Sequence, residues 1–268
     1  MSLSPKPRKI TKAVIPAAGK GTRLLPLTKA VPKELIPLGA KPVLEHIIEE
    51  VAASGITDVL FVISEEKTAI RRHFGDHSHG IDFSYTFQPE QKGLADAVYC
   101  GKEWVGDDHF AVVLGDSVIE TDQSVLPFRR VIDIYESTSA SGVIVVQKTP
   151  CEEVHRYGIV KPKYGVAPSF QIDAIVEKPR PEEAPSDYAV AGRYAFDPVI
   201  FDYIEWTPRG AGGEYQISDT IGLMMRDGLE TWCVALGERE IRRDIGTFDT
   251  YFEAFELEVA RFRAWQSD

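Results

Sequence analysis

Short apolar runs alternate with amphipathic segments through the first half of the chain. Residues 10–15, 57–63, 83–87 and 110–114 are rich in β-branched and aromatic residues, as buried parallel strands are. Between them, residues 42–54, 66–73 and 93–102 predict helices; the first carries Val43, Leu44, Ile47, Ile48 and Val51 on one face. Strand, helix and strand in this order predict an α/β fold, Rossmann-like and doubly wound around a mostly parallel central sheet.

The second half has a more mixed pattern. Strands are predicted at 142–147, 170–177, 188–196 and 231–235, with Pro-rich turns between them. Two helices are predicted to close the chain. The last has an aromatic stripe that we expect to pack on the domain or on a second subunit: Phe248, Phe252, Phe255, Val259 and Phe262.

Composition and charge narrow the class of protein. The 268-residue chain has 44% hydrophobic and 26% charged residues, as soluble globular proteins do. Its net charge of −11 argues against a nucleic-acid partner, because phosphate backbones usually meet basic surfaces. We find no apolar run of the roughly 20 residues that a membrane helix needs. We therefore expect no membrane partner. The three cysteines form no CxxC pair, which is typical of a reducing compartment, so we expect the protein in the cytoplasm.

The turn after the first strand carries the first candidate chemistry. Ala17-Ala18-Gly19-Lys20-Gly21-Thr22-Arg23 offers small residues, backbone N–H groups and polar side chains that suit an anion. It lacks the GxxxxGK[ST] spacing of a Walker A loop and the third glycine of a dinucleotide fingerprint. A tight structural turn is the alternative. Lys33 and Lys41 follow before the first long helix, and cations there favour a phosphate site.

Six blocks, in order along nearly the whole chain, resemble one family. They are IPAAGKGTRLLPLTKAVPKELIPLGAKPVLEHII, QPEQKGLADAV, VVLGDSV, RYGIV, IVEKP with VAGRY, and GAGGEYQISDTI. The chain is thereby similar to the bacterial UTP–glucose-1-phosphate uridylyltransferases (UDP-glucose pyrophosphorylases), within the sugar-nucleotide pyrophosphorylases. The resemblance implies a single nucleotidyltransferase domain, glycosyltransferase-A-like in fold. That domain would consist of a nucleotide-binding half (about 8–125), a sugar-phosphate half (about 126–246) and a C-terminal helix (247–268).

The resemblance also implies site residues. The triphosphate would be wrapped by Ala17, Ala18, Gly19, Gly21, Thr22, Arg23 and the neighbouring Lys33. Gln88 and Gly93 would face the base, since an amide and a backbone group can pair with a pyrimidine edge. The sugar phosphate would be held by Gly158, Glu177, Lys178 and Gly192. Asp116 and Asp244 would bind Mg²⁺, which typically takes one or two carboxylates plus phosphate oxygens.

Each role has a simpler alternative. Asp116 can form a strand-end turn, Asp244 can cap the last helix, Gln88 can be an ordinary loop residue, and Glu177-Lys178 can be a solvated strand end. The base is open between UTP and dTTP. Gly115-Asp116 and Ala95-Asp96 depart from the uridylyltransferase pattern, while VAGRY and GAGGEYQ favour it. A non-catalytic nucleotide-binding paralogue is the alternative of another class.

The expected chemistry is a direct in-line displacement. A sugar 1-phosphate oxygen attacks the α-phosphorus of UTP, and pyrophosphate leaves. The attacking phosphate has a second pKa near ~6, so it needs no general base at neutral pH. Arg23, Lys33, Asp116 and Lys178 are the expected catalytic residues. The substrates would be UTP and glucose 1-phosphate, and we expect a homo-oligomer, a dimer or tetramer.

Overall fold

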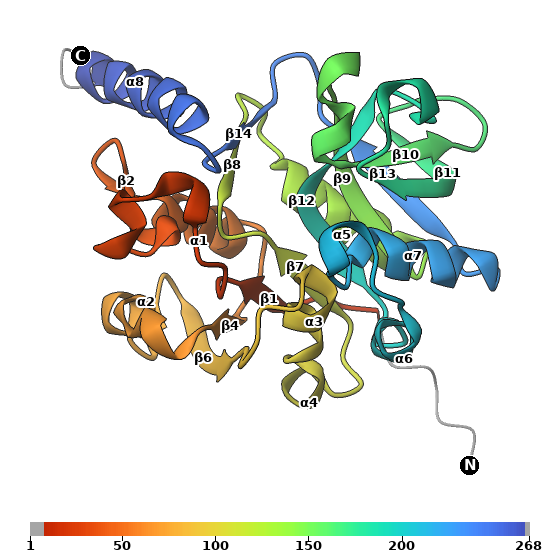
Figure 1. Ribbon diagram of the computed structural model, residues 1–268, viewed down its shortest axis with the longest axis horizontal. Coiled ribbons are helices and arrows are strands. Elements are labelled where there is room, and N and C mark those ends of the chain that lie inside the picture. The colour runs from red at the N-terminus through yellow and green to blue at the C-terminus, as the bar shows by residue number, and fades with distance from the viewer. Residues whose placement is uncertain (1–7, 266–268) are drawn as a thin grey trace.

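A computed structural model describes residues 8–265 of the chain, with a ten-stranded sheet running through both halves (Figure 1). The strand order is β10-β11-β13-β9-β12-β7-β1-β4-β6-β5. The first-half strands are β1 (Lys12–Pro16), β4 (Asp58–Ile63), β5 (His77–Ser78), β6 (Ile81–Phe87) and β7 (Phe110–Val113). The second-half strands are β9 (Gly142–Lys148), β10 (Gly158–Pro162), β11 (Ser169–Glu177), β12 (Tyr188–Phe196) and β13 (Thr231–Ala235).

Strand direction differs between the halves as the sequence predicts. β7, β1, β4 and β6 are parallel neighbours, whereas β12 runs antiparallel to both β7 and β9. The α/β fold with a mixed second half is therefore confirmed. The carboxyl ends of β1 and β7 are adjacent, which is where ligands bind in open α/β sheets.

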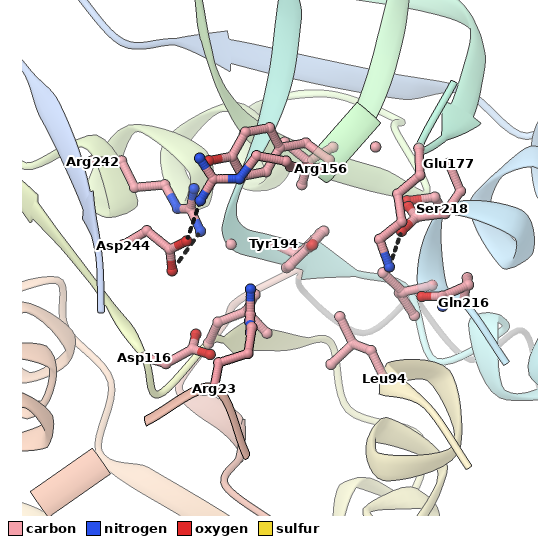
Figure 2. Close-up of a pocket in the computed structure, with 17 residues that line it drawn as sticks. Arg23, Leu94, Asp116, Arg156, Glu177, Tyr194, Gln216, Ser218, Arg242 and Asp244 are labelled. Atoms are coloured by element: carbon pink, nitrogen blue, oxygen red, sulfur yellow. Dashed lines mark ion pairs between the residues drawn. The ribbon is translucent and has the colours of Figure 1, made fainter. Parts of the chain in front are cut away.

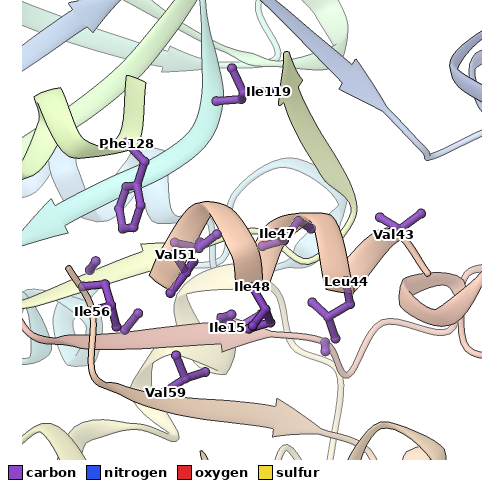
Figure 3. Close-up of a cluster of buried hydrophobic side chains, with 14 of the residues drawn as sticks. Ile15, Val43, Leu44, Ile47, Ile48, Val51, Ile56, Val59, Ile119 and Phe128 are labelled. Carbon is purple, nitrogen blue, oxygen red and sulfur yellow. The ribbon is translucent and has the colours of Figure 1, made fainter. Parts of the chain in front are cut away.

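Helices cover both faces of the sheet. One face carries α1 (Val43–Ala53), α2 (Thr68–Phe74), α5 (Pro127–Ser137) and, beyond the sheet, α8 (Phe248–Trp265). The other carries α3 (Leu94–Tyr99), α4 (Lys102–Val105), α6 (Ile200–Trp206) and α7 (Ile217–Arg226). Adjacent residues of β1 belong to opposite cores. Ile15 packs with the buried face of α1 (Figure 3), and Val14 packs on the other side of the sheet, in the cluster that includes α3. No helix in residues 8–265 is long and apolar enough to cross a membrane.

Two predicted helices differ in detail from the structure. The helix expected at 93–102 is divided into α3 and α4 at Cys100-Gly101. A Cβ on Gly101 would lie 3.1 Å from Val14 Cγ2 and 3.3 Å from Leu60 Cδ2, so glycine permits the close approach to the sheet. The last helix begins at Phe248, one residue after the predicted start at 247, while residues 266–268 of the predicted range lie outside the described residues.

The aromatic stripe predicted on the last helix is only partly right. Tyr251 and Ala254 are the buried positions, and Phe248 and Phe255 pack beside them against the core. Phe252 and Phe262 are exposed, because the packed face follows positions 248, 251 and 255 instead of 248, 252 and 255.

A two-stranded ribbon outside the main sheet was not predicted. β8 (Ser117–Glu120) pairs antiparallel with β14 (Ile241–Asp244), with Ser117 opposite Asp244. A second small ribbon joins β2 (Pro37–Leu38) to β3 (Lys41–Pro42) before α1. The first ribbon returns the end of the chain to the carboxyl edge of β7.

A buried ion pair ties this edge to the sheet. Arg193 on β12 is fully buried; its Nη2 donates to Glu50 Oε2 at 2.7 Å and to the Ser117 carbonyl at 2.9 Å. Glu50 comes from α1, so one guanidinium joins α1, β12 and the start of β8.

We expect Glu50→Ala to destabilise the fold by about 3–5 kcal/mol, because it leaves the Arg193 charge buried and unpaired. Glu49→Ala is the matched control on the same helix: it removes an exposed partner of Lys41 and should cost less than about 1 kcal/mol. Urea unfolding at neutral pH measures both. Equal losses for the two variants would contradict the role of Arg193.

Candidate active site

The glycine-rich turn continues directly from β1. Ala17 N still donates to the Val62 carbonyl at 2.8 Å, so the chain leaves the sheet only after this residue. Gly21 then adopts a left-handed conformation, with φ of 65°, and starts a short 3-10 helix, Thr22–Leu24. A Cβ on Gly21 would lie 2.9 Å from Thr28 Cγ2, so both its backbone angle and its surroundings require glycine.

A buried ion pair supports this turn from below. Lys67 Nζ lies 2.9 and 2.7 Å from the two carboxylate oxygens of Glu34 and donates to the Ala17 carbonyl at 2.8 Å. Burial raises the pKa of Glu34 and lowers the pKa of Lys67, while their direct contact opposes both shifts. The pair fixes the position of the turn relative to α2.

A second ion pair lies at the sheet edge itself. Lys33 Nζ is 2.6 Å from Asp116 Oδ2. Burial pushes the pKa of Asp116 upward, but the Lys33 ammonium, together with the charges of Arg242 and Arg23, lowers it to about 2. Burial likewise opposes the charge on Lys33, and Asp116 and Glu34 together raise its pKa to about 12. At neutral pH, Asp116 is therefore an ionised carboxylate able to bind a cation.

The β8–β14 ribbon brings the second predicted carboxylate to the same place. Ile245 N donates to the Asp116 carbonyl at 3.0 Å, directly after Asp244. The Asp244 carboxylate lies 3.6 Å from Arg156 Nη2 and 3.6 Å from Arg242 Nη2 (Figure 2). Thr247 takes the capping role that was the alternative for Asp244, since Thr250 N donates to Thr247 Oγ1 at 3.3 Å.

A cavity of about 320 Å³ opens beside these carboxylates (Figure 2). Seven of the predicted site residues line it: Arg23, Asp116, Gly158, Glu177, Lys178, Gly192 and Asp244. A Cβ on Gly158 would lie 2.6 Å from Ser218 Oγ and 3.1 Å from Glu177 Oε2, so this glycine leaves room for the Glu177 carboxylate. The cavity therefore combines carboxylates and cations in a space suited to a small phosphorylated molecule.

Lys178 has an unusual backbone conformation for a lysine, with φ of 48°. Its N–H donates to the Tyr157 carbonyl at 2.9 Å, which holds the conformation. Its Nζ lies 3.4 Å from Glu177 Oε1, so the ammonium stays over the cavity. Such strained positions cluster at functional sites.

A larger cavity of about 1030 Å³ lies on the other side of the glycine-rich turn. Ala18, Thr22 and Gln88 of the predicted residues line it, together with the basic side chains of Lys20, Lys29, Lys67 and Arg72. Thr22 lines the larger cavity and Arg23 lines the smaller one, so the glycine-rich turn lies between the two cavities. Ala17, Gly19, Gly21, Lys33 and Gly93 are not part of either lining but shape the turn and the edge behind it.

Several lining residues were not singled out from the sequence. Lys67 lies outside the six motif blocks, and its buried contact with Glu34 gives no local sequence signal. Four others lie within motifs from which a neighbour was chosen or that were quoted for the family: Arg156, Tyr194, Gln216 and Ser218. Arg242 lies two residues before the predicted Asp244. The block RYGIV was used for Gly158 alone, although its arginine points to the same cavity (Figure 2).

Comparison with known proteins defines the class. Residues 12–260 match the family model described as Nucleotidyl transferase, and the chain belongs to this family. It is 42% identical to a UTP–glucose-1-phosphate uridylyltransferase of Bacillus subtilis, over 80% of each chain. It is 40% identical to UTP–glucose-1-phosphate uridylyltransferase 2 of Staphylococcus saprophyticus, over 82% of each chain. The family resemblance drawn from the six motifs is thus confirmed.

Solved structures agree with this assignment. A UDP-glucose pyrophosphorylase complexed with UDP-glucose has a TM-score of 0.86 and 30% identity, covering 94% of this chain and 99% of its own. A UTP-bound enzyme of the same name from Acinetobacter baumannii has a TM-score of 0.85 and 28% identity, covering 97% and 99%. The chain is therefore a nucleotidyltransferase of the UDP-glucose pyrophosphorylase type in both sequence and fold.

The Lys33–Asp116 pair predicts a specific pH dependence. A carboxyl group whose pKa is lowered by folding stabilises the native state above its unfolded pKa of about 3.9, and this stabilisation is lost as the pH falls toward 2. The difference in unfolding free energy between wild type and Asp116→Asn should therefore be largest at pH 6 and shrink by pH 3. Urea titrations at both pH values test it. A constant difference would contradict the ion pair.

Proposed function

We propose that this protein joins UTP and glucose 1-phosphate to form UDP-glucose and pyrophosphate. The observation that carries the proposal is that Asp116, Asp244, Arg23 and Lys178 line one cavity, with Lys33 paired to Asp116 behind it. The relatives of the chain bear this enzyme name. The larger cavity would take the nucleotide. The smaller would take the sugar phosphate, with Glu177 accepting hydrogen bonds from sugar hydroxyls.

The two carboxylates fit a magnesium ion. Both are acidic oxygen ligands at one edge of the sheet, and the low pKa of Asp116 keeps it ionised. Mg²⁺ commonly binds one or two carboxylates together with substrate phosphates. Held by Asp116 and Asp244, it would supply positive charge next to the α-phosphate. When Asp116 binds the metal, the Lys33 ammonium must share the carboxylate with the ion or move away from it. We assign the leaving pyrophosphate as the new hydrogen-bond acceptor for Lys33.

The reaction needs no proton transfer. A non-bridging oxygen of glucose 1-phosphate forms a bond to the α-phosphorus of UTP as the bond to the β-phosphate bridging oxygen breaks. The electron pair leaves with pyrophosphate. Arg23 and Lys33 would bind the departing group and Lys178 the attacking phosphate. The role of these residues is to hold two anions together in line and to stabilise the charge that develops.

Quaternary structure and location remain predictions. Phe252 and Phe262 give α8 an exposed apolar surface, which supports a homo-oligomer, either a dimer or a tetramer. The cytoplasm is the compartment in which we expect the enzyme to work.

A panel of nucleotides tests the proposed function. With glucose 1-phosphate and Mg²⁺, pyrophosphate release should be fastest with UTP among UTP, dTTP, GTP, CTP and ATP, and EDTA should abolish it. Asp116→Asn should reduce the rate by about a hundredfold or more, because the variant would hold Mg²⁺ less well and the negative charge on the α-phosphate would no longer be balanced. Preference for dTTP would show that the nucleotide site selects thymine and not uracil. Binding of UTP without pyrophosphate release would point to a non-catalytic paralogue.

Lys178 tests the division between the two cavities. Lys178→Met should lower kcat/KM for glucose 1-phosphate roughly 10- to 100-fold, as expected for a lost charge-assisted hydrogen bond, and leave the KM for UTP nearly unchanged. Lys163→Met, an exposed lysine in the β10–β11 turn, is the control and should behave as wild type. A rise in the KM for UTP alone would place Lys178 in the nucleotide site.

A further inference from the structure

The side-chain amide of Gln88 is held in one orientation by two acceptors. Its Nε2 lies 2.6 Å from Asp96 Oδ2 and 3.3 Å from the Gly93 carbonyl oxygen. Neither a carboxylate nor a carbonyl can donate a hydrogen bond, so the amide NH₂ must face both. The Gln88 backbone is fixed as well, since its N–H donates to the Ile63 carbonyl at 2.9 Å at the end of β4.

The other end of the amide faces the larger cavity. Gln88 is 5% exposed and lines that cavity. Its Oε1 accepts no hydrogen bond from the residues that the structure describes, and it is not among their buried unpartnered atoms. The oxygen is therefore available to a ligand, and the amide presents an acceptor only.

Asp96 is positioned for this contact by the start of α3. The helix begins at Leu94, directly after Gly93, whose φ of 117° is accessible to glycine. A Cβ on Gly93 would lie 2.5 Å from the Tyr215 carbonyl oxygen, so the turn is packed against the segment before α7. Asp96 lies in the first turn of α3, where a carboxylate is also stabilised by the free N–H groups of the helix.

We propose that Asp96 is a positioning residue that sets base specificity: it fixes the Gln88 amide so that the nucleotide site accepts uracil and rejects cytosine. Uracil carries a hydrogen-bond donor at N3 between two carbonyl groups, whereas cytosine has an acceptor at N3. The outward Gln88 oxygen pairs with the first and repels the second. This inference rests on the proposed function, in which Gln88 faces the base.

A free amide would lose this discrimination. Without the Asp96 carboxylate, Gln88 keeps only the longer contact to the Gly93 carbonyl, and rotation about its last bond offers an NH₂ donor to cytosine N3. The ion-assisted hydrogen bond to Asp96 is the stronger of the two restraints. Loss of the Asp96 carboxylate is therefore expected to lower kcat/KM for UTP and to raise kcat/KM for CTP.

The experiment compares kcat/KM for UTP and CTP, measured by pyrophosphate release at saturating glucose 1-phosphate, with dissociation constants for both nucleotides by calorimetry. Asp96→Ala should lower the UTP:CTP ratio about tenfold or more, in a protein that still unfolds cooperatively in urea. Glu103→Ala, an exposed acidic residue on the neighbouring α4, is the control and should leave the ratio unchanged.

A double-mutant cycle isolates the proposed mechanism. Gln88→Ala should also lower the ratio, and Asp96→Ala added to it should cause no further change, because Asp96 acts through the Gln88 amide. An unaltered ratio in Asp96→Ala, or an equal loss in the presence and absence of Gln88, would overturn the proposal. If the wild-type protein does not use UTP, the proposed function is wrong. If the wild-type protein uses UTP but Asp96→Ala leaves the UTP:CTP ratio of kcat/KM unchanged, only the proposed role of Asp96 is wrong.

Discussion

The pairing of β14 with β8 is the constraint on which the candidate site depends. Asp116 ends the turn after β7, in the parallel part of the sheet, whereas Asp244 lies more than a hundred residues later. The register that places Asp244 opposite Ser117, together with the bond from Ile245 N to the Asp116 carbonyl, brings the two together. A shift of one residue in this ribbon would turn the Asp244 side chain to the opposite face. Arg193 anchors the same ribbon from β12.

Electrostatic balance explains how charged groups lie so close at a sheet edge. The Glu34–Lys67 pair is beneath the glycine-rich turn, and the Lys33–Asp116 pair is beside it. Each partner offsets part of the other's desolvation, so the edge remains folded before any substrate binds. The same arrangement suits the proposed chemistry, in which anionic phosphates replace carboxylates as partners of the cations.

Local pattern was sufficient to predict most of the fold. The strands at 142–147, 170–177, 188–196 and 231–235 correspond closely to β9, β11, β12 and β13 because each is a β-branched or aromatic run. β8 and β14 are only four residues long, too short for such a run, and they are held by pairing with each other, with β8 packed on α1 and β14 on α8. The end of α3 at Tyr99, before the predicted limit at 102, was not predicted because Gly101 matters only through contact with Val14 and Leu60 in the sheet.

The site was predictable where a motif identified it and less so elsewhere. Seven residues selected through motif resemblance line the smaller cavity. Lys67 was missed, because it acts through a buried partner 33 positions away. Asp96 had been noted only as a departure from the family pattern. Its contact with Gln88 depends on how the turn at Gly93 folds back, which the sequence alone does not show.

That turn has a consequence for how the two cavities are built. Tyr215 N donates to the Lys92 carbonyl at 2.7 Å, and Ala95 N donates to the Tyr215 carbonyl at 3.0 Å, so the backbone on either side of Gly93 is joined to the residue preceding Gln216. Gln216 and Ser218 line the smaller cavity. The turn beside Gln88, in the larger cavity, and the segment that lines the smaller cavity are therefore joined by direct main-chain hydrogen bonds, so the walls of the two cavities form one continuous backbone unit.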